Sequence, residues 1–451
     1  MAACKHFEIC GLSDEADPAG GFCILHSNDS AKDRQRFSTA LDAHRKVKGL
    51  NFAHIVFPDR VSYSGIVFPK LVNFREAKFM EEADFRNTRF TQGVNFGQSR
   101  FEKTAKFEMA SFDKQTDFSG TCFVDQVCFS LAVFAEKVFF DRTSFGRVTH
   151  FIGARFLNGA SFSPLFPRDA WVDFSKCSFK GTILFGPVII GPKESIPLFR
   201  DTQVNFRQVI LDPPDCITFL FPDFKKCHLL DTDLRKVLIT GATWPEIPSR
   251  LAQYATDLFG LKSAKISDLL RKHVRGRVGV YDELCLPREY PGYPWERIER
   301  LYRELKQNFE DRRDYERAGD FHFGEKEMRR YNRKTNPGLR LWLTLYWLFS
   351  GYGERYFRPL VWAAILFVIS TTGYMALGLR FRPEQGGTIL ALTSLWDWLL
   401  ASNYSLRVMT FLRPEELIPI GCARFINTAQ SLLGPLLLGL FALALRQRLR
   451  R

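Results

Sequence analysis

The chain lacks the short motifs that most catalytic sites require. It contains no HExxH or paired-carboxylate motif, no glycine-rich phosphate-binding loop and no recognisable catalytic triad. Residues 1–30 contain no apolar run of the kind found in secretory signals. The ten cysteines are scattered and form no disulfide framework, which is typical of a reducing cytoplasm. These absences predict a protein that is not an enzyme.

An aromatic residue recurs every eleven positions from residue 52 to residue 162, and a second series lies five residues behind it. The first series is Phe52, Tyr63, Phe74, Phe85, Phe96, Phe107, Phe118, Phe129, Phe140, Phe151 and Phe162. The second is Phe57, Phe68, Phe79, Phe90, Phe101, Phe112, Phe123, Phe134, Phe145 and Phe156. A fixed period is typical of repeat folds, whose units bury one another's faces and serve as binding surfaces more often than as enzymes.

The period of eleven also occurs in right-handed coiled coils, but the sequence excludes that structure. On a helix, residues five apart point roughly 130–140° away from each other, so the two series would form no single apolar face. The position two residues before the aromatic one is almost always small or β-branched, as in Ala83, Thr88 and Val94. Residues i−2 and i share a face in an extended chain, so the pattern predicts a β-type wall.

This unit, for example Ala-Asp-Phe-Arg-Asn at residues 83–87, resembles the pentapeptide-repeat family. The resemblance implies a right-handed, four-sided β-helix with one aromatic or leucine side chain per side. Every second pentapeptide here carries one additional residue, which we expect at a corner or bulge. The pattern is clear over residues 50–165, is interrupted by Pro and Gly between residues 164 and 192, and returns at Phe224.

The predicted fold class is mixed: a right-handed quadrilateral β-helix, then an α-helical connector and a two-helix transmembrane domain. The expected divisions are a zinc-knuckle-like module (1–30), a helical linker (31–49), the β-helix (50–180), a loop or cap insertion (181–221), a last repeat coil (222–244), a helical connector (245–338), an interfacial helix (339–355) and a two-span pore-loop-like membrane domain (356–451).

The positive charge of the chain is concentrated outside the repeats. The net charge is +14, yet residues 50–190 hold 17 Lys or Arg against 14 Asp or Glu, a difference of only +3. Several pentapeptide-repeat proteins imitate DNA with an acidic surface, and this balance excludes such a role. The surplus flanks hydrophobic segments, at Lys326, Arg329, Arg330, Arg333, Lys334, Arg340, Arg446, Arg448, Arg450 and Arg451. We therefore expect a lipid bilayer, and not a nucleic acid, as the acidic partner.

The N-terminal segment contains a set of metal-ligand side chains in an otherwise polar sequence. Cys4, Cys10, Cys23 and His26 would complete a tetrahedral shell around one structural zinc ion. The run Phe-Cys-Ile-Leu-His-Ser at residues 22–27 resembles a Cys-rich module at the start of pentapeptide-repeat proteins that have a membrane domain. His6 is a less well spaced substitute ligand. The alternative is a set of ordinary cytosolic thiols beside a surface histidine.

Two stretches near the C-terminus are long enough to cross a membrane. Residues 359–379 and 425–445 carry no charge, and 21 helical residues at 1.5 Å each cover a ~30 Å hydrocarbon core. The flanking basic residues predict a multi-pass protein of the bacterial inner (cell) membrane with both termini in the cytoplasm. Trp342, Tyr346 and Trp347 predict an interfacial helix over residues 339–349 that leads into the first span.

Residues 392–411, between the spans, have the length and apolar character of a re-entrant helix. The order of span, re-entrant helix and span resembles the two-span pore-loop module of the potassium-channel-like superfamily. No Thr-x-Gly-Tyr-Gly filter follows this helix, and the Gly-Tyr-Gly at residues 351–353 precedes the first span. The sequence therefore does not support potassium selectivity.

Polar residues recur on the second span at i, i+3, i+4 and i+7 spacing, which predicts one helix face toward the axis of an oligomer. The candidate pore residues are Met409, Thr410, Phe411, Asn427, Gln430, Ser431 and Gly434. By resemblance the oligomer is a homotetramer. The leading hypothesis is an ion-channel-like pore gated by a cytoplasmic repeat domain that binds an unknown protein or ligand. The alternative is a non-conducting membrane-anchored interaction scaffold.

The connector is strongly helical over residues 295–330, and we expect a break near Gly319. Acidic residues and a histidine follow one another in its second half: Asp314, Glu316, Asp320, His322, Glu325 and Glu327. No known metal or acid–base motif matches their spacing, so we interpret them as a solvated helix face.

Overall fold

The computed structural model describes residues 4–6, 8, 21–29, 31–191, 194–248, 277–285, 292, 294–382, 388–412 and 416–449. The chain divides into two compact units, Met1–Asn308 and Phe309–Arg451. The first unit contains a β-solenoid with a helix near its start, and the second is helical. The expectation of a mixed fold, with a β-helix followed by helices, is confirmed.

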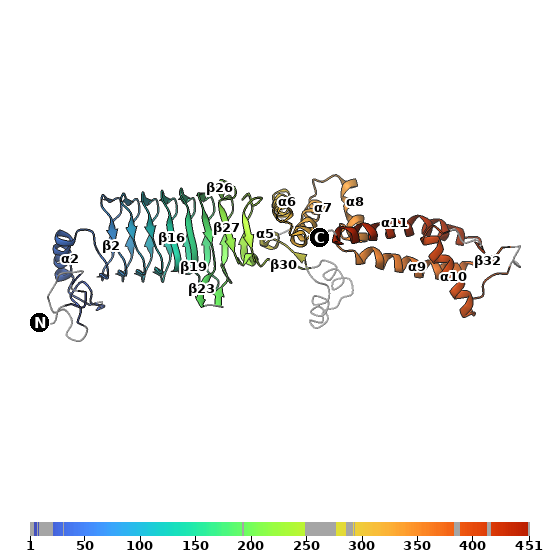
Figure 1. Cartoon of the computed structure of the whole chain (residues 1–451), viewed down its shortest axis with the longest axis horizontal. Helices are drawn as coiled ribbons and strands as arrows, with labels where there is room; N and C mark the ends of the chain where they lie inside the picture. Colours follow the sequence, from blue (N-terminus) through green and yellow to red (C-terminus); the bar gives the residue numbers. More distant parts are fainter. Residues whose placement is uncertain are drawn as a thin grey trace. The chain divides into compact units, whose positions relative to one another are not determined.

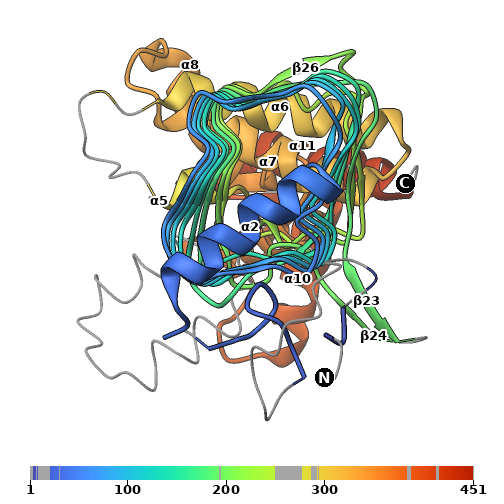
Figure 2. The same ribbon diagram turned by 90° about the vertical axis from the view of Figure 1, so that its left-hand side faces the viewer.

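The solenoid has four walls made of short parallel strands, and Figure 2 shows their four-sided outline from the end. One wall contains β2 (Val61–Ser62), β6 (Ala83–Asp84), β10 (Ala105–Lys106), β14 (Val127–Cys128), β17 (Val148–His150), β20 (Trp171–Asp173), β25 (Gln203–Asn205) and β28 (Cys227–His228). A second contains β3 (Val67–Phe68), β7 (Arg89–Phe90), β11 (Ser111–Phe112), β15 (Val133–Phe134), β18 (Arg155–Phe156), β21 (Ser178–Lys180) and β26 (Ile210–Asp212).

The other two walls begin separately and merge. They start as β1 (Val56–Phe57), β5 (Lys78–Phe79), β9 (Arg100–Phe101) and β13 (Cys122–Phe123), and as β4 (Val72–Asn73), β8 (Val94–Asn95) and β12 (Thr116–Asp117). They join at β16 (Val138–Ser144), which runs through a corner and pairs with both β12 and β13. The merged sheet continues through β19 (Ala160–Leu165), β22 (Ile183–Phe185), β27 (Ile217–Leu220) and β29 (Leu238–Thr240). Figure 1 shows the successive coils stacked on one another.

The register explains the eleven-residue period. Val56 pairs with Lys78 and Phe57 with Phe79, so each turn of the coil takes 22 residues, or twice eleven. The additional residue lies in the longer interval between aromatic residues, for example between Phe79 and Phe85. The shorter interval turns at a corner with positive φ, as in Glu76 at 56°. Such corners recur at His54, Gly65, Glu76, Asn87, Gln98, Met109, Gly120, Leu131, Arg142 and Gly153. At the Glu76 corner, Ala77 N donates to Phe74 O at 3.0 Å, which closes a tight turn.

Many of these corners are also held by the side chain that precedes the aromatic residue. Asn73 Oδ1 accepts from Arg75 N at 3.0 Å, and Asp84, Asn95 and Asp117 accept in the same way two residues on. An Asn or Asp side chain in this position accepts a hydrogen bond from the backbone N–H two residues on, which stabilises the turn. The sequence analysis did not identify this role, although Asn or Asp recurs at that position.

The solenoid interior is a stack of aromatic rings. Phe85 and Phe107 are parallel to within 2° with centroids 4.9 Å apart, while Phe85 and Phe96 on adjacent walls meet edge to face at 5.4 Å. The small residues beside them, such as Ala83 and Ala105, are fully buried. Inward threonines donate to backbone carbonyls, as Thr88 Oγ1 does to Tyr63 O at 2.8 Å. Parallel and edge-to-face contacts are both favourable for aromatic pairs. A ring such as Phe85 therefore stabilises the core through the ring stacked on it and through a ring of the adjacent wall.

The solenoid continues through residues 181–221, where we expected a loop or cap. Phe185 stacks on Phe162 at 4.7 Å and Phe219 stacks on Phe185 at 4.9 Å. Ile183 pairs with Ile217, 34 residues on, because this turn also contains the hairpin β23 (Val188–Gly191) and β24 (Glu194–Ile196). The inserted hairpin shifts the spacing of the aromatic residues, so a fixed period does not reveal this turn.

Each end of the solenoid has a cover in the same unit. At the start, α2 (Arg34–Lys48) lies across the first coil (Figure 2), and Phe37 meets Phe57 edge to face at 6.1 Å. The short helix η1 (Phe224–Lys226) lies within the last coil, before β28 and β29. After that coil come β30 (Glu246–Ile247), β31 (Arg277–Val278), α5 (Tyr281–Cys285) and α6 (Trp295–Asp311). Asn308 Nδ2 donates to the carbonyls of Leu234 and Val237, which a further coil would otherwise pair.

The second unit consists of helices and one pair of short antiparallel strands. Its elements are α7 (Tyr315–Tyr331), α8 (Pro337–Ser350), α9 (Phe357–Leu377), β32 (Leu379–Phe381), α10 (Leu395–Met409), β33 (Leu417–Pro419) and α11 (Ala423–Leu449). The break before α7 lies at residues 312–314 and not near Gly319, because Asp314 caps α7 by accepting from Arg317 N. Gly319 is buried inside α7.

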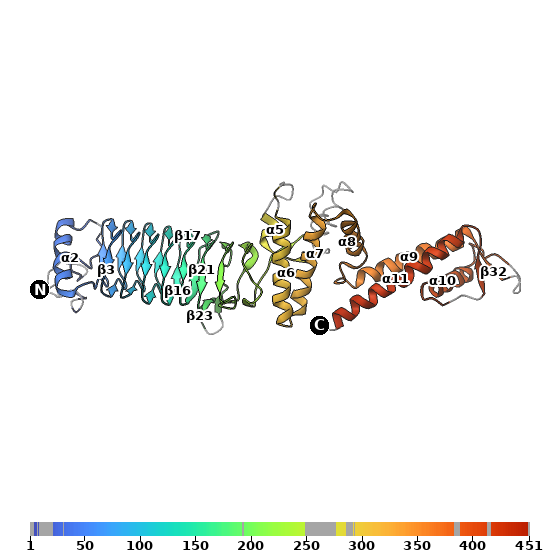
Figure 3. The same ribbon diagram turned by 90° about the horizontal axis from the view of Figure 1, so that it is seen from above.

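Helices α9 and α11 run antiparallel, and Figure 3 shows them side by side with α10. Tyr374 bonds to Gln430 near one end, and Ala363 lies in one apolar cluster with Leu437 near the other. The windows Phe357–Leu377 and Ala423–Arg446 are long and apolar enough to cross a membrane, by length and composition. Much of their apolar surface is exposed, for example at Ile369 and Leu432.

Candidate functional site

Three of the four predicted metal ligands lie together at the start of the chain. Cys4 Sγ and Cys23 Sγ are 3.4 and 3.2 Å from His26 Nδ1, and all three side chains are buried. Their ligand atoms lie within 4.8 Å of one another, so the cluster could hold a metal ion. Cys10, the fourth predicted ligand, lies outside the described residues. The structure therefore brings together the part of the predicted site that it describes.

Backbone hydrogen bonds and burial define the surroundings of the cluster. The amide N–H groups of His6 and Cys23 donate to Cys4 Sγ at 3.4 and 3.3 Å. Burial, with smaller contributions from His6 and His54, lowers the pKa of His26 to about 4. A neutral imidazole and a thiolate are the forms that bind a metal, so the donor set fits zinc.

Lys32 attaches the cluster to the solenoid, a role that the sequence analysis did not foresee. Its Nζ donates to Ile24 O, Ser27 O and Val56 O at 3.0, 3.2 and 2.6 Å. Burial lowers the pKa of this amine to about 8. Val56 N also donates to Leu25 O at 2.9 Å, so the segment between Cys23 and His26 pairs with the first strand. The cluster is thus part of the cover at the N-terminal end of the solenoid.

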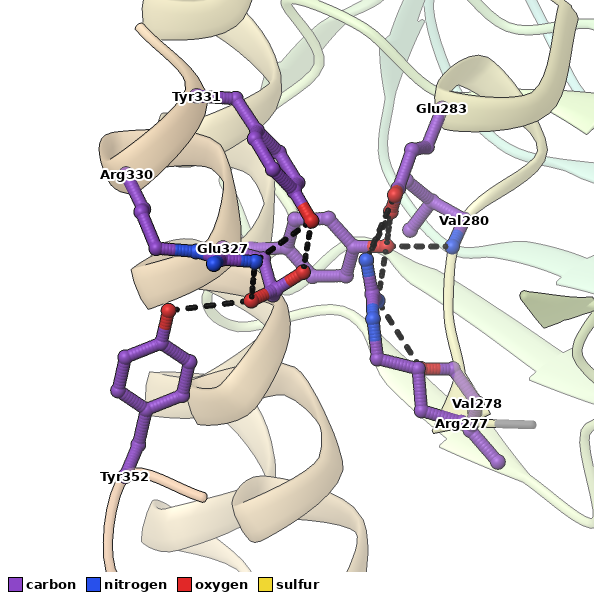
Figure 4. A network of polar contacts seen from close by, with 9 residues as sticks. Arg277, Val278, Val280, Glu283, Glu327, Arg330, Tyr331 and Tyr352 are labelled. Atoms are coloured by element: carbon purple, nitrogen blue, oxygen red, sulfur yellow. Dashed lines mark hydrogen bonds and ion pairs between the residues drawn. The ribbon is translucent and has the colours of Figure 1, made fainter. Parts of the chain in front are cut away.

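Two clusters of buried polar residues, one in each unit, are drawn in Figure 4. In the first unit, Arg277 Nη2 donates to Glu283 Oε1 at 2.7 Å and Tyr302 OH donates to Glu283 Oε2 at 2.6 Å. Beside them, the buried Asp282 accepts from Leu229 N at 2.7 Å and contacts His228 Nδ1 at 2.9 Å. These acids fasten the segment that follows the last coil.

In the second unit, Glu327 accepts from Arg330, Tyr331 and Tyr352 at 2.9, 2.7 and 3.1 Å. Glu325 and Glu327 are buried, which corrects our expectation of a solvated face for the acidic residues of the connector. Tyr352 belongs to the Gly-Tyr-Gly turn, in which all three residues have positive φ. Its ring is buried and packs edge to face on Phe323 at 5.1 Å, so this turn is a structural element of the fold.

The polar residues of α11 are bonded inside one chain. Gln430 is fully buried, accepts from Tyr374 OH at 2.8 Å and donates to Ser405 Oγ at 2.6 Å. Asn427 Oδ1 accepts from Tyr404 OH at 3.0 Å. Gln430 and Asn427 therefore connect α11 to α9 and α10. Hydrogen bonds of this kind are an ordinary means of joining helices in an apolar environment.

The remaining candidate pore residues divide between the bundle core and its surface. Met409 is buried with Ala363 and Leu437, and a Cβ atom on Gly434 would lie 2.9 Å from Met409 Cα. Ser431 Oγ donates to Thr428 O, and Thr410 Oγ1 donates to Leu406 O. Phe411 is 76 % exposed. Within one chain, Met409 and Gly434 lie in contact and Phe411 is exposed, and the lining that we expected in an oligomer stays a prediction.

The comparisons with known proteins identify the repeats. The family model for pentapeptide repeats (9 copies) matches residues 52–100. These residues are pentapeptide repeats. The match covers the first coils of the solenoid, and the parallel pairing of successive coils continues beyond it to β29. Neither the search of curated proteins nor the search of solved structures gives a match.

Proposed function

We propose that this chain is a non-catalytic, membrane-anchored scaffold whose β-solenoid binds a cytoplasmic protein or ligand. The observation that carries this proposal is the bonding of Gln430, which uses its polar groups on Tyr374 and Ser405 of the same chain. A bundle in which Gln430 and Ser405 pair with each other inside one chain can sit in lipid without a pore. The near-balanced charge of the solenoid supports a protein or ligand partner over a nucleic acid.

The membrane placement in this proposal is the inner membrane of a bacterium, with both termini in the cytoplasm. Arg358 near the start of α9 and Arg446 near the end of α11 supply basic residues at the same end of the antiparallel pair. Basic residues favour the cytoplasmic side. The exposed apolar residues of α9 and α11, such as Val368 and Leu436, would then contact lipid.

A gated, ion-channel-like pore formed by a homotetramer is the second candidate. It is favoured by the order of apolar helix, shorter helix α10 and apolar helix, and by Pro435 inside α11 next to Gly434, where a helix can bend. In this case Gln430 would have to exchange its intrachain hydrogen bonds for water in the open state.

Conductance separates the two candidates. The purified full chain is reconstituted in planar bilayers and current is recorded over a range of voltage and pH, alone and with Gln430→Cys or Leu436→Cys. The scaffold predicts no single-channel current and no reaction of a cysteine at position 430 with a water-soluble thiol reagent. Current that this reagent changes at position 430, but not at the exposed position 436, would establish the pore instead.

We also propose that Cys4, Cys10, Cys23 and His26 bind one structural zinc ion per chain. Zinc would supply the free energy that a short polar segment needs to stay folded on the solenoid end. Metal analysis of the purified protein should give one zinc per chain, and Cys4→Ser with Cys23→Ser should remove it. Cys285→Ser, which changes an exposed thiol elsewhere, is the matched control. Unchanged zinc in the double variant would disprove the site.

A further inference from the structure

Helix α8 has an exposed apolar face. Leu341, Trp342 and Leu345 are 63 %, 66 % and 39 % exposed. Positions i, i+1 and i+4 lie on one side of a helix, so the three side chains form a single surface. The opposite side of α8 is occupied, because Leu343 is buried in a cluster with Phe323 and Tyr352. The exposed face is therefore additional to the surface that holds α8 in the unit.

Two of the three aromatic residues that we expected at a lipid interface serve the fold instead. Trp347 lies between the guanidinium groups of Arg330 and Arg358, at 4.5 and 5.3 Å from its ring centroid. The ring of Tyr346 lies 5.8 Å from that of Tyr352. Only Trp342 of the three is mostly exposed. Trp342 and the two leucines thus define the surface that needs a partner.

Cationic residues accompany this surface. Arg340 directly precedes Leu341 and is half-buried. Arg333, in the turn before α8, is exposed. A phosphate oxygen is a strong acceptor for a guanidinium group. An apolar face flanked by arginines fits a surface that offers both hydrocarbon and phosphate.

The position of α8 relative to the apolar helices points to the same partner. Trp362 Nε1 in the second turn of α9 donates to Leu348 O at 3.1 Å, and its ring meets Phe349 at 5.6 Å. The last turn of α8 therefore packs beside the start of α9. The exposed apolar surface continues from the first turn of α9 at Phe357 and Leu360. Helix α8 lies at the basic end of the α9–α11 pair.

We propose that Leu341, Trp342 and Leu345 lie in the headgroup region of an anionic lipid leaflet, with Arg333 and Arg340 against the lipid phosphates. This inference rests on the proposed membrane attachment of α9 and α11. It adds a surface anchor that recognises lipid charge, because each basic residue near an anionic surface strengthens attachment. The helix would fix the orientation of the connector at the membrane, which two spans alone do not determine.

Depth measurements in lipid test the proposal. A fluorescent amino acid is placed by codon suppression at position 342 of the full chain, and in a second sample at position 432, an exposed position of α11. Both are reconstituted in vesicles of phosphatidylcholine, with or without one part in three of phosphatidylglycerol, and brominated lipids quench the label. We expect quenching at position 432 in both lipids and at position 342 mainly in the anionic vesicles.

Removing the charges tests the lipid selectivity. Arg333→Gln and Arg340→Gln should each reduce the quenched population at position 342 about five-fold in anionic vesicles. Arg300→Gln, which removes an exposed charge from α6, is the matched control. It should leave the quenched population at position 342 unchanged. Equal quenching in both lipids would overturn the anionic selectivity.

The two reporters also distinguish failure of this inference from failure of the proposed function. Quenching at position 432 without quenching at position 342 would overturn the surface anchor and leave the spans in place. Absence of quenching at both positions would overturn the membrane attachment as well. Cross-linking between copies through position 342, with the label shielded from lipid, would show that a second chain covers this face instead.

Discussion

The solenoid and the α9–α11 bundle expose different kinds of residue. In the solenoid, phenylalanine rings such as Phe107 are completely buried and the outer positions carry ion pairs such as Arg89–Asp113. In the bundle, apolar side chains such as Leu432 are exposed, while Gln430 and Ser405 are buried. The solenoid sorts its residues as a protein in water does. The exposed apolar surface of the bundle agrees with the proposed membrane attachment of α9 and α11.

The two regions also satisfy their backbone differently. Solenoid strands of two or three residues bond to the turn before and the turn after, as β10 does to β6 and β14. Helices α9 and α11 satisfy their backbone internally, which a membrane requires. A solenoid turn therefore depends on its neighbours, whereas each bundle helix depends on contacts at a few positions. The following predictions test this difference, from the largest effect to the smallest.

Removing one ring from the stack should cause the largest loss of stability. Phe107→Ala takes away a buried ring that touches Phe85, Phe129 and the adjacent walls, and should cost about 3–5 kcal/mol of unfolding free energy. Thermal unfolding of the full chain, followed by circular dichroism of the β-sheet signal, measures the effect. Lys103→Ala at an exposed position of the same coil should be nearly neutral. Equal shifts for both variants would contradict the stacked core.

Two glycines of α11 offer a matched test of helix packing in the bundle. A Cβ on Gly434 would meet Met409 Cα at 2.9 Å, whereas nothing lies within 4 Å of a Cβ on Gly439. Gly434→Ala should destabilise the bundle by about 1–3 kcal/mol through overpacking. Gly439→Ala should stabilise it slightly, because alanine favours a helix. Thermal unfolding in detergent micelles measures both, and the reverse order would show that α10 does not pack on α11.

Asp320 predicts a pH dependence confined to the connector. Burial raises the pKa of its carboxyl to about 6, although Arg355 and Arg317 oppose the shift. A raised folded-state pKa gives stability that is present below the unfolded value near 4 and is lost as the pH rises through 6. Asp320→Asn should therefore raise the stability at pH 7 by about 1 kcal/mol, after allowance for solvent screening, and flatten the change between pH 4 and 6.

The control for Asp320 is Glu310→Gln, which removes an exposed acid from the last turn of α6. It should keep the pH dependence of the wild-type chain. Unfolding in urea at several pH values, followed by the helical signal, measures both variants. The same dependence in Asp320→Asn and wild type would show that Asp320 ionises as it does in water.

The smallest effect should come from the solenoid corners. Met109 has φ at 57°, a left-handed conformation that is unfavourable for a residue with a side chain. Its side chain is 56 % exposed, so packing contributes little to offset this cost. Met109→Gly should be neutral or stabilise the chain by about 0.5–1 kcal/mol, because glycine adopts positive φ freely. Met109→Val should destabilise it, since a β-branched residue avoids this region. A loss of stability in Met109→Gly would indicate that the side chain of Met109 stabilises the corner by packing.

The sequence by itself determined the solenoid, because each of its contacts repeats. The eleven-residue period fixed the inward rings, and the small residue two positions earlier fixed the extended backbone. Length and absence of charge were likewise enough to find the apolar windows of α9 and α11. The spacing of cysteine and histidine in the N-terminal segment likewise predicted the cluster of Cys4, Cys23 and His26. All of these signals are local or periodic, so a linear sequence displays them directly.

The contacts of residues outside the repeats are visible only in the tertiary structure. No local pattern shows that Gln430 would bond to Ser405 on α10, or that Lys32 would tie the Cys/His segment to Val56. The hairpin at β23 and β24 lengthened one coil to 34 residues and hid it from a search for a fixed period. Asp314 caps the start of α7, so the break expected near Gly319 lies before Asp314, and the Gly-Tyr-Gly turn is a buried structural element through Tyr352. Such contacts join residues far apart in the chain, and their free energy depends on burial and partners that composition does not encode.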